Sequence, residues 1–320
     1  MSLTSNSYSA CILECDMASP TRSSTRVRLL AVALALLLSV AAGCSGSGAA
    51  EPGPDPTTAA TLPPEPAGKV VAGFVAFGDF GGGDAQHEVA RAMERWAADG
   101  HRVDALVTTG DNVYDNGEPE KFRAQLDEPY RELRRTRPLW VTLGNHDVKD
   151  GNGPNQLRHL GLPDLPYVKE LPGVQLLFVD ANRPDQAQAD WLDARLSERG
   201  PPFRVVVFHQ PAWSCSNHDS DGEVDQFWVP VFERHRVALI LNGHDHNYQR
   251  FVSDAGVTYV VTGGGGNGLY RLDECGNDEP RRVALAMRHH FTAVEVRARS
   301  LTLTAVTDGG AVLDRAVIER

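Results

Sequence analysis

Three observations predict a layered α/β fold for most of this chain. From Lys69 onward, apolar runs of strand length alternate with amphipathic stretches of helix length. The last run, residues 291–306, alternates apolar and polar residues as antiparallel strands do. The chain has 320 residues, 42% of them hydrophobic, and no internal repeat, so it is long enough for one large core. We therefore expect a single folded domain over residues 69–320.

The expected strands are apolar runs that end in turn-forming residues. In chain order they cover residues 70–79, 103–111, 137–147, 174–182, 203–211 and 237–245, followed by antiparallel strands within 291–306 that would close a sheet. Helices are expected at 85–99, 122–135, 188–199 and 224–236. Val89, Met93 and Trp96 share one face of the first helix, and Pro129 should break or kink the second.

The segment before this domain is predicted to be an export signal and a tether. Residues 1–43 hold the basic stretch TRSSTRVR and the apolar run Leu29–Ala42, which is short for a membrane span. The sequence AAGC, ending at Cys44, resembles the bacterial lipobox. We therefore expect an exported protein held at the membrane surface by a lipid on Cys44, with a soluble secreted form or an uncleaved anchor as alternatives. Met17 is an alternative start.

Residues 44–68 are rich in small residues and proline and should form the tether.

The net charge and the cysteine content limit which partners, cofactors and cellular compartment this chain can have. The net charge of -11 and the lack of a dense Lys/Arg stripe argue against nucleic acid as a partner. An acidic chain that acts on a small anion needs local positive charge, which metal ions supply. Two of the five cysteines precede the signal and Cys44 is the lipid candidate, which leaves Cys215 and Cys275 to form one disulfide in an oxidising compartment.

Residues with metal-binding atoms gather where predicted strands end. Four apolar runs end in a glycine followed by such residues, and a fifth ends in a histidine. The residues are Asp79, Asp111 with Tyr114, Asn145 with His146, His244 with His246, and His209. Each alone is explained by turn chemistry or a packed histidine. Together they predict a metal site, because the carboxyl ends of strands in an open α/β sheet border one crevice. The glycines would let the backbone turn sharply before each ligand.

The motifs GDFG, GDNVY, GNHD, FHQP with AWSCSNH, and GHDHN resemble, in order and spacing, those of purple acid phosphatases of the short, tartrate-resistant type. These enzymes belong to the calcineurin-like metallophosphoesterase superfamily. Gly81 stands where most of that superfamily has histidine, and Tyr114 stands where the purple acid group has tyrosine. The resemblance implies a four-layer α/β/β/α sandwich, with two mixed sheets flanked by helices.

The resemblance also implies roles for single residues. Asp79, Asp111, Tyr114 and His246 would hold Fe(III), and Asp111, Asn145, His209 and His244 would hold a divalent Fe, Zn or Mn. Phosphomonoesters would be hydrolysed by attack of a metal-bound hydroxide. His146 and His218 would protonate the leaving group. Asp147, Asn247 and Tyr248 would orient ligands or wall the pocket.

Two other functions remain open at this point. One is a phosphodiesterase or nucleotide pyrophosphatase of the same superfamily, which would need a more open cleft. The other is a catalytically silent surface metal-binding protein, against which the complete ligand set argues. Six further histidines are assigned no role in the site: His87, His101, His159, His235, His289 and His290. A monomer is expected.

Overall fold

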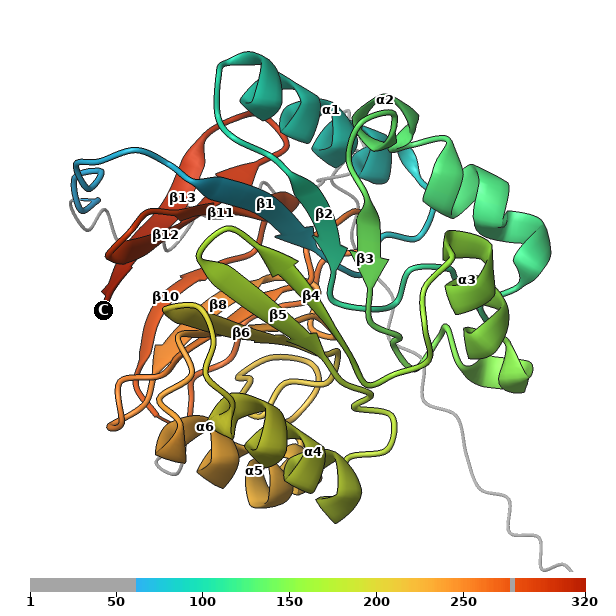
Figure 1. Cartoon of the computed structure of the whole chain (residues 1–320). Helices are drawn as coiled ribbons and strands as arrows, with labels where there is room; N and C mark the ends of the chain where they lie inside the picture. Colours follow the sequence, from blue (N-terminus) through green and yellow to red (C-terminus); the bar gives the residue numbers. More distant parts are fainter. Residues whose placement is uncertain (1–61, 277–279) are drawn as a thin grey trace, which may run out of the picture. The chain divides into compact units, whose positions relative to one another are not determined.

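The computed structural model describes residues 62–276 and 280–320, and these residues lie within one compact unit. Two sheets form its centre (Figure 1). The first has the strand order β13 (Val312–Glu319), β12 (Ser300–Thr307), β11 (His290–Val296), β1 (Ala72–Phe77), β2 (Ala105–Thr108) and β3 (Leu139–Val141). The second has the order β10 (Arg282–Ala286), β8 (Tyr248–Val252), β9 (Thr258–Thr262), β7 (Leu239–Asn242), β6 (Phe203–Val207), β5 (Val174–Phe178) and β4 (Tyr167–Leu171).

Both sheets are mixed. In the first, β1, β2 and β3 are parallel, while β11, β12 and β13 add to the other edge of β1 as antiparallel strands. In the second, β5, β6, β7 and β9 are parallel, and β4, β8 and β10 run against their neighbours. The prediction that the tail closes a sheet with antiparallel strands is confirmed.

Helices cover the outer face of each sheet, which confirms the four-layer arrangement (Figure 1). The first sheet is covered by α1 (Asp84–Ala98), α2 (Arg131–Arg134) and α3 (Gly153–Leu160), and the second by α4 (Gln186–Ser197), α5 (Gly222–Phe227) and α6 (Val229–Arg234). Val89 and Met93 of α1, predicted to share one helix face with Trp96, lie in one buried cluster with Val75 and Phe77 of β1. A separate buried cluster joins the facing sides of the two sheets. Burial of these apolar surfaces holds the layers together.

Two predicted helices are interrupted in the structure. The segment 119–134 divides into a short 3-10 turn (Pro119–Lys121), a π-helical turn (Arg123–Asp127) and α2, with Pro129 between the last two. The helix expected at 224–236 divides at Trp228, two residues before Pro230, whose ring nitrogen has no proton to donate to the preceding turn. Counting only α-helices and β-strands of the described residues, six were not predicted: α3, β4, β8, β9, β10 and β13. A further 3-10 turn covers Lys149–Gly151.

The predicted export signal, Cys44 and most of the tether lie outside the described residues. Within 62–276 and 280–320, no helix has both the length and the apolar character to cross a bilayer.

Candidate metal centre

The predicted ligands follow the carboxyl ends of five parallel strands. Asp79 comes two residues after β1, and Asp111 and Asn145 follow β2 and β3 of the same sheet. His209 and His244 each come two residues after a strand of the second sheet, β6 and β7. The site is therefore built where the ends of two sheets meet, as the strand-end pattern predicted.

Four of the candidate side chains form one group. The Tyr114 hydroxyl lies 3.1 Å from Asp111 Oδ2 and 3.2 Å from His246 Nε2. His246 Nε2 in turn lies 3.6 Å from Asp79 Oδ1. These are the four residues assigned to the first metal, and their donor atoms face one another.

The second group shares Asp111 with the first. His209 Nε2 lies 3.4 Å from Asp111 Oδ2 and 3.2 Å from Asn145 Oδ1. His244 Nδ1 lies 3.3 Å from the same His209 nitrogen. One oxygen, Asp111 Oδ2, therefore contacts both groups, as a bridging ligand between two ions would.

The chemistry of the cluster fits cations. Ligand atoms of Asp79, Asp111 and His209 all lie within 4.8 Å of one another, and these side chains are buried. Burial, with the nearby Asp111 carboxylate, raises the pKa of Asp79 well above its usual value. Burial also opposes protonation of His209, yet the Asp111 carboxylate raises its pKa to about 9. Two buried carboxylates this close need a positive partner, and a metal ion supplies one. The structure thus contains a buried Asp/His metal site.

Hydrogen bonds on the far side of the imidazoles set their tautomers. His209 Nδ1 donates to Thr109 O over 2.9 Å, and His246 Nδ1 donates to Gly268 O over 2.6 Å. Each ring is thereby turned with its Nε2 toward the cluster, the orientation in which that nitrogen can bind a metal ion. Burial lowers the pKa of His246 to about 4 and that of His244 to about 2, which keeps both rings neutral near pH 7.

Glycine precedes several of the ligands because a side chain at that position would collide with the cluster. A side chain on Gly144 would place its Cβ 2.1 Å from Asp111 Oδ1, and one on Gly110 would come within 2.7 Å of His209 Nδ1. The sharp backbone turn is made largely by the ligands themselves. Asp79, Asp111 and His244 have φ values of 60°, 50° and 71°, in the left-handed region that non-glycine residues rarely adopt. The expected role of glycine is thus corrected in part: it permits close approach more than it turns the chain.

The two predicted proton donors lie beside the cluster. His146 is about a quarter exposed, and its Nε2 lies 4.0 Å from Asp111 Oδ2 while its Nδ1 lies 2.7 Å from Asp115 O. The His218 ring is half-buried and stacks on His244 with a centroid distance of 4.0 Å. Both rings therefore reach the site from outside the set of seven ligands.

Buried polar residues next to the motifs hold the ligand loops in place. Asp147 accepts hydrogen bonds from the backbone N–H groups of Asn112, Val113 and Gly144, and it is fully buried. Burial raises its pKa to about 6. Asp245, which the sequence analysis missed, lies between two predicted ligands and accepts from the His218 backbone N–H at 3.0 Å. Its position inside a histidine motif is the one local signal that could have identified it.

The prediction that Tyr248 lines the pocket is wrong. Tyr248 is fully buried between the sheets, and its hydroxyl donates to Asp314 Oδ2 at 2.6 Å.

The predicted disulfide between Cys215 and Cys275 is present.

Comparison with known proteins gives the same assignment. The sequence profile described as calcineurin-like phosphoesterase matches residues 73–248. Purple acid phosphatase 4 of Arabidopsis thaliana is 27% identical over 248 residues, covering 65% of this chain and 71% of the plant protein. Tartrate-resistant acid phosphatase type 5 of Homo sapiens is 24% identical over 299 residues, covering 77% of this chain and 90% of the human protein. The structure of purple acid phosphatase PPD1 from yellow lupin seeds matches with a TM-score of 0.66 at 17% identity, over 81% of this chain and 55% of the lupin chain.

The fold and the buried Asp/His cluster define a metallophosphoesterase. The chain belongs to the calcineurin-like phosphoesterase family, whose profile matches more than half of it. Within this family it is a distant homologue of plant purple acid phosphatases and of tartrate-resistant acid phosphatase type 5. The resemblance stated from the motifs is confirmed.

Proposed function

We propose that this protein is an exported acid phosphatase that hydrolyses phosphomonoesters at a two-metal centre. The observation that carries the proposal is the position of Asp111 Oδ2, which lies 3.1 Å from the Tyr114 hydroxyl and 3.4 Å from His209 Nε2. A carboxylate oxygen placed between two groups of ligands suits a pair of ions better than a single ion.

Each group of side chains favours a different kind of ion. Asp79, Asp111 and Tyr114 offer anionic oxygens beside the His246 nitrogen, which favours a hard, highly charged ion such as Fe(III). Asn145, His209 and His244 offer an amide oxygen and two imidazoles, which favours divalent Fe, Zn or Mn. When bound, the two ions would neutralise phosphate charge and supply a hydroxide nucleophile at low pH.

The chain itself supplies proton transfer and orientation. As the bond between phosphorus and the leaving oxygen breaks, the protonated ring of His218 or His146 gives its proton to that oxygen, and a neutral alcohol departs. Both rings border the ligand cluster, His218 over His244 and His146 beside Tyr114 at a centroid distance of 4.4 Å. Asp147 and Asp245 hold the loops from which these rings project.

Export is part of the proposal. The Cys215–Cys275 disulfide supports folding in an oxidising compartment. A lipid on Cys44 would then keep a monomeric domain at the cell surface.

Metal analysis combined with ester hydrolysis tests the proposal. We expect about two metal ions per chain and turnover of p-nitrophenyl phosphate that is faster at acid than at neutral pH. Preferential hydrolysis of bis-(p-nitrophenyl) phosphate would instead identify a phosphodiesterase. Full metal occupancy without hydrolysis of either ester would identify a silent metal-binding protein.

A further inference from the structure

Two loops far apart in sequence cover the imidazoles of the metal centre. His218, from the first loop, stacks on His244 with a centroid distance of 4.0 Å and an interplanar angle of 28°. Tyr270, from the second loop, stacks on His246 at 3.9 Å and 12°. The two covering rings also meet edge to face at 5.4 Å. The positions of His218 and Tyr270 therefore depend on how these loops are held.

The two loops are fastened to each other by covalent and backbone links. The Cys215–Cys275 disulfide joins them, and Ser216 and Leu272 form an isolated antiparallel bridge. The backbone N–H of Asp273 donates to Cys215 O at 3.0 Å. These links bind one loop to the other but do not by themselves fix either loop relative to the sheet.

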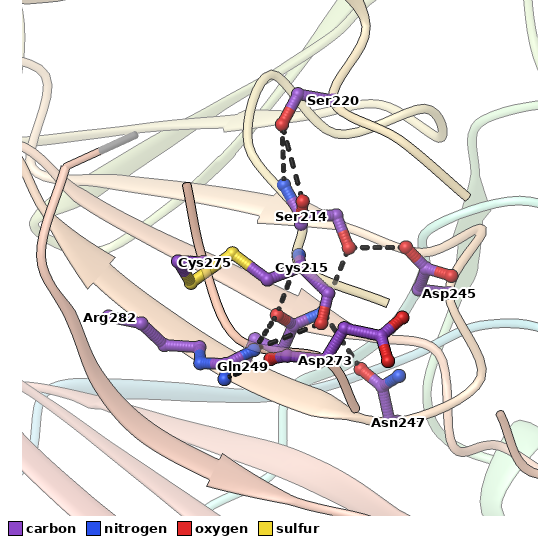
Figure 2. Close-up of a disulfide and its surroundings, with 9 residues drawn as sticks. All are labelled: Ser214, Cys215, Ser220, Asp245, Asn247, Gln249, Asp273, Cys275 and Arg282. Atoms are coloured by element: carbon purple, nitrogen blue, oxygen red, sulfur yellow. Dashed lines mark hydrogen bonds between the residues drawn. A yellow bond between two sulfur atoms is a disulfide. The ribbon is translucent and has the colours of Figure 1, made fainter. Parts of the chain in front are cut away.

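Gln249 of β8 provides that attachment (Figure 2). It is fully buried, and its Oε1 accepts from the backbone N–H of Cys215 at 3.0 Å and from Arg282 Nη1 at 2.9 Å. Its Nε2 donates to Ser214 Oγ at 2.8 Å and to Asn247 Oδ1 at 3.1 Å. Both the oxygen and the nitrogen of the Gln249 amide are therefore used in hydrogen bonds. A replacement without an amide would leave the buried partners of these atoms unpaired.

Arg282 of β10 completes the attachment from the neighbouring strand. Its Nη1 also donates to Cys215 O at 3.0 Å, and its Nη2 donates to Asp273 O at 2.6 Å. One guanidinium thus holds both loops, beside the disulfide that joins them (Figure 2).

A chain of hydrogen bonds leads from Gln249 to His218. Gln249 bonds the Ser214 hydroxyl, which donates to Asp245 Oδ2, and Asp245 Oδ1 accepts from the His218 backbone N–H at 3.0 Å. The backbone of His218 is therefore held by a buried carboxylate that is itself oriented by Ser214. A displacement of about 1 Å at a reacting group can cost on the order of 10²-fold in rate, so such support has a kinetic consequence.

We propose that Gln249 is a positioning residue for His218: together with Arg282 and the disulfide, it holds the loop 214–218 so that the His218 ring faces the leaving group. The inference rests on the proposed phosphatase activity. It assigns Gln249 no contact with substrate or metal, since its partners are Ser214, Cys215, Asn247 and Arg282.

The test uses Gln249→Met, which keeps the volume of the side chain and removes its amide. We expect unchanged metal content, a loss of about 10-fold to 100-fold in turnover of an alkyl phosphate, and a smaller loss with p-nitrophenyl phosphate, whose leaving group needs little protonation. In a His218→Ala background the same substitution should have no further effect, because the group that it positions is gone.

Hydrogen exchange supplies a readout that does not require activity. Gln249→Met should speed exchange of the amides in residues 214–220 of the metal-loaded protein, and Arg282→Lys should do so to a smaller extent. Gln188→Met is the matched control. Gln188 is also buried and donates to the backbone oxygens of Asp180 and Arg183, but it braces a different loop, so its loss should leave the preference between the two esters unchanged.

Three results would overturn the positioning role: equal slowing of both esters, unchanged exchange at 214–220, or full additivity with His218→Ala. If Gln249→Met does not fold, Arg282→Lys is measured by the same criteria. An inactive wild-type protein with both metals bound would refute the phosphatase function instead, and the exchange result would still decide whether Gln249 holds the loop.

Discussion

His290 makes the stability of this protein depend on pH in a way that can be calculated. The side chain is fully buried at the start of β11. Its Nδ1 donates to Arg288 O at 2.9 Å, and its Nε2 accepts from the Thr262 hydroxyl at 3.1 Å. Both ring nitrogens are thus used by the neutral form. Burial, with the nearby His289, lowers the pKa of His290 from 6.5 to about 4.

The direction of the effect follows from which state binds the proton first. As the pH falls below about 6.5, the unfolded chain becomes protonated at this histidine while the folded protein does not, so unfolding becomes more favourable. The loss is absent at higher pH and is complete once the folded ring is also protonated, near pH 4. The separation of the two pKa values corresponds to about 3 kcal/mol of unfolding free energy.

Urea unfolding of wild type and His290→Gln at two pH values measures this contribution. Between about pH 7.5 and pH 4.5, the wild-type free energy of unfolding should fall by about 2 kcal/mol more than that of the variant. Comparing the two proteins cancels the effects of other acid groups and of metal loss. Gln188→Met, a buried substitution in α4 that removes no titratable group, should follow the pH dependence of wild type. Parallel pH dependence in wild type and His290→Gln would refute the reasoning.

Three further predictions concern the metal centre and the disulfide. Tyr114→Phe should bleach the visible absorption that a phenolate bound to Fe(III) gives, and an unchanged spectrum would show that the tyrosine is no ligand. Replacing Cys215 and Cys275 together by serine should lower the free energy of unfolding by about 4 kcal/mol, since the closed loop spans 60 residues; a loss below about 1 kcal/mol in denaturant would contradict this entropic account. Asn145→Ala should release the second metal, whereas His146→Ala should keep both metals and slow alkyl phosphates about 10²-fold. Metal analysis separates these outcomes, and metal loss in the His146 variant would contradict its role as proton donor.

The strands that carry the site could be predicted because their signal is local. β1, β2, β3, β6 and β7 are apolar runs, and each is followed within a few residues by its ligands. β4 and β10 were missed because they are edge strands with mostly half-exposed residues, so neither a buried run nor a regular alternation marks them. Low burial thus accounts for the two missed edge strands, but not for β9, whose five residues are all buried and which was also missed.

Residues that hold the site in place were harder to predict than the ligands. Tyr248 and Gln249 are neighbours in β8, yet alternation along the strand turns the first toward the inter-sheet core and the second toward the His218 loop. Their different roles follow from where the strand begins, which the sequence alone does not show. Gln249 meets Cys215 and Arg282 only after the chain has folded.

The pairing of β1 with β11 has a consequence for the order of folding. Ala72 of β1 lies opposite Val296 of β11. During synthesis, β1 therefore lacks this neighbouring strand until more than two hundred further residues have been made. Asp79, the first predicted ligand, follows that strand directly. A nascent or clipped chain that stops before His290 would carry every predicted ligand and still leave one edge of β1 open to solvent or to another chain. The sheet that carries Asp79 is therefore completed only after the antiparallel tail has been synthesised. Because the pairing of β1 with β11 joins segments far apart in the sequence, we expect this domain to fold slowly.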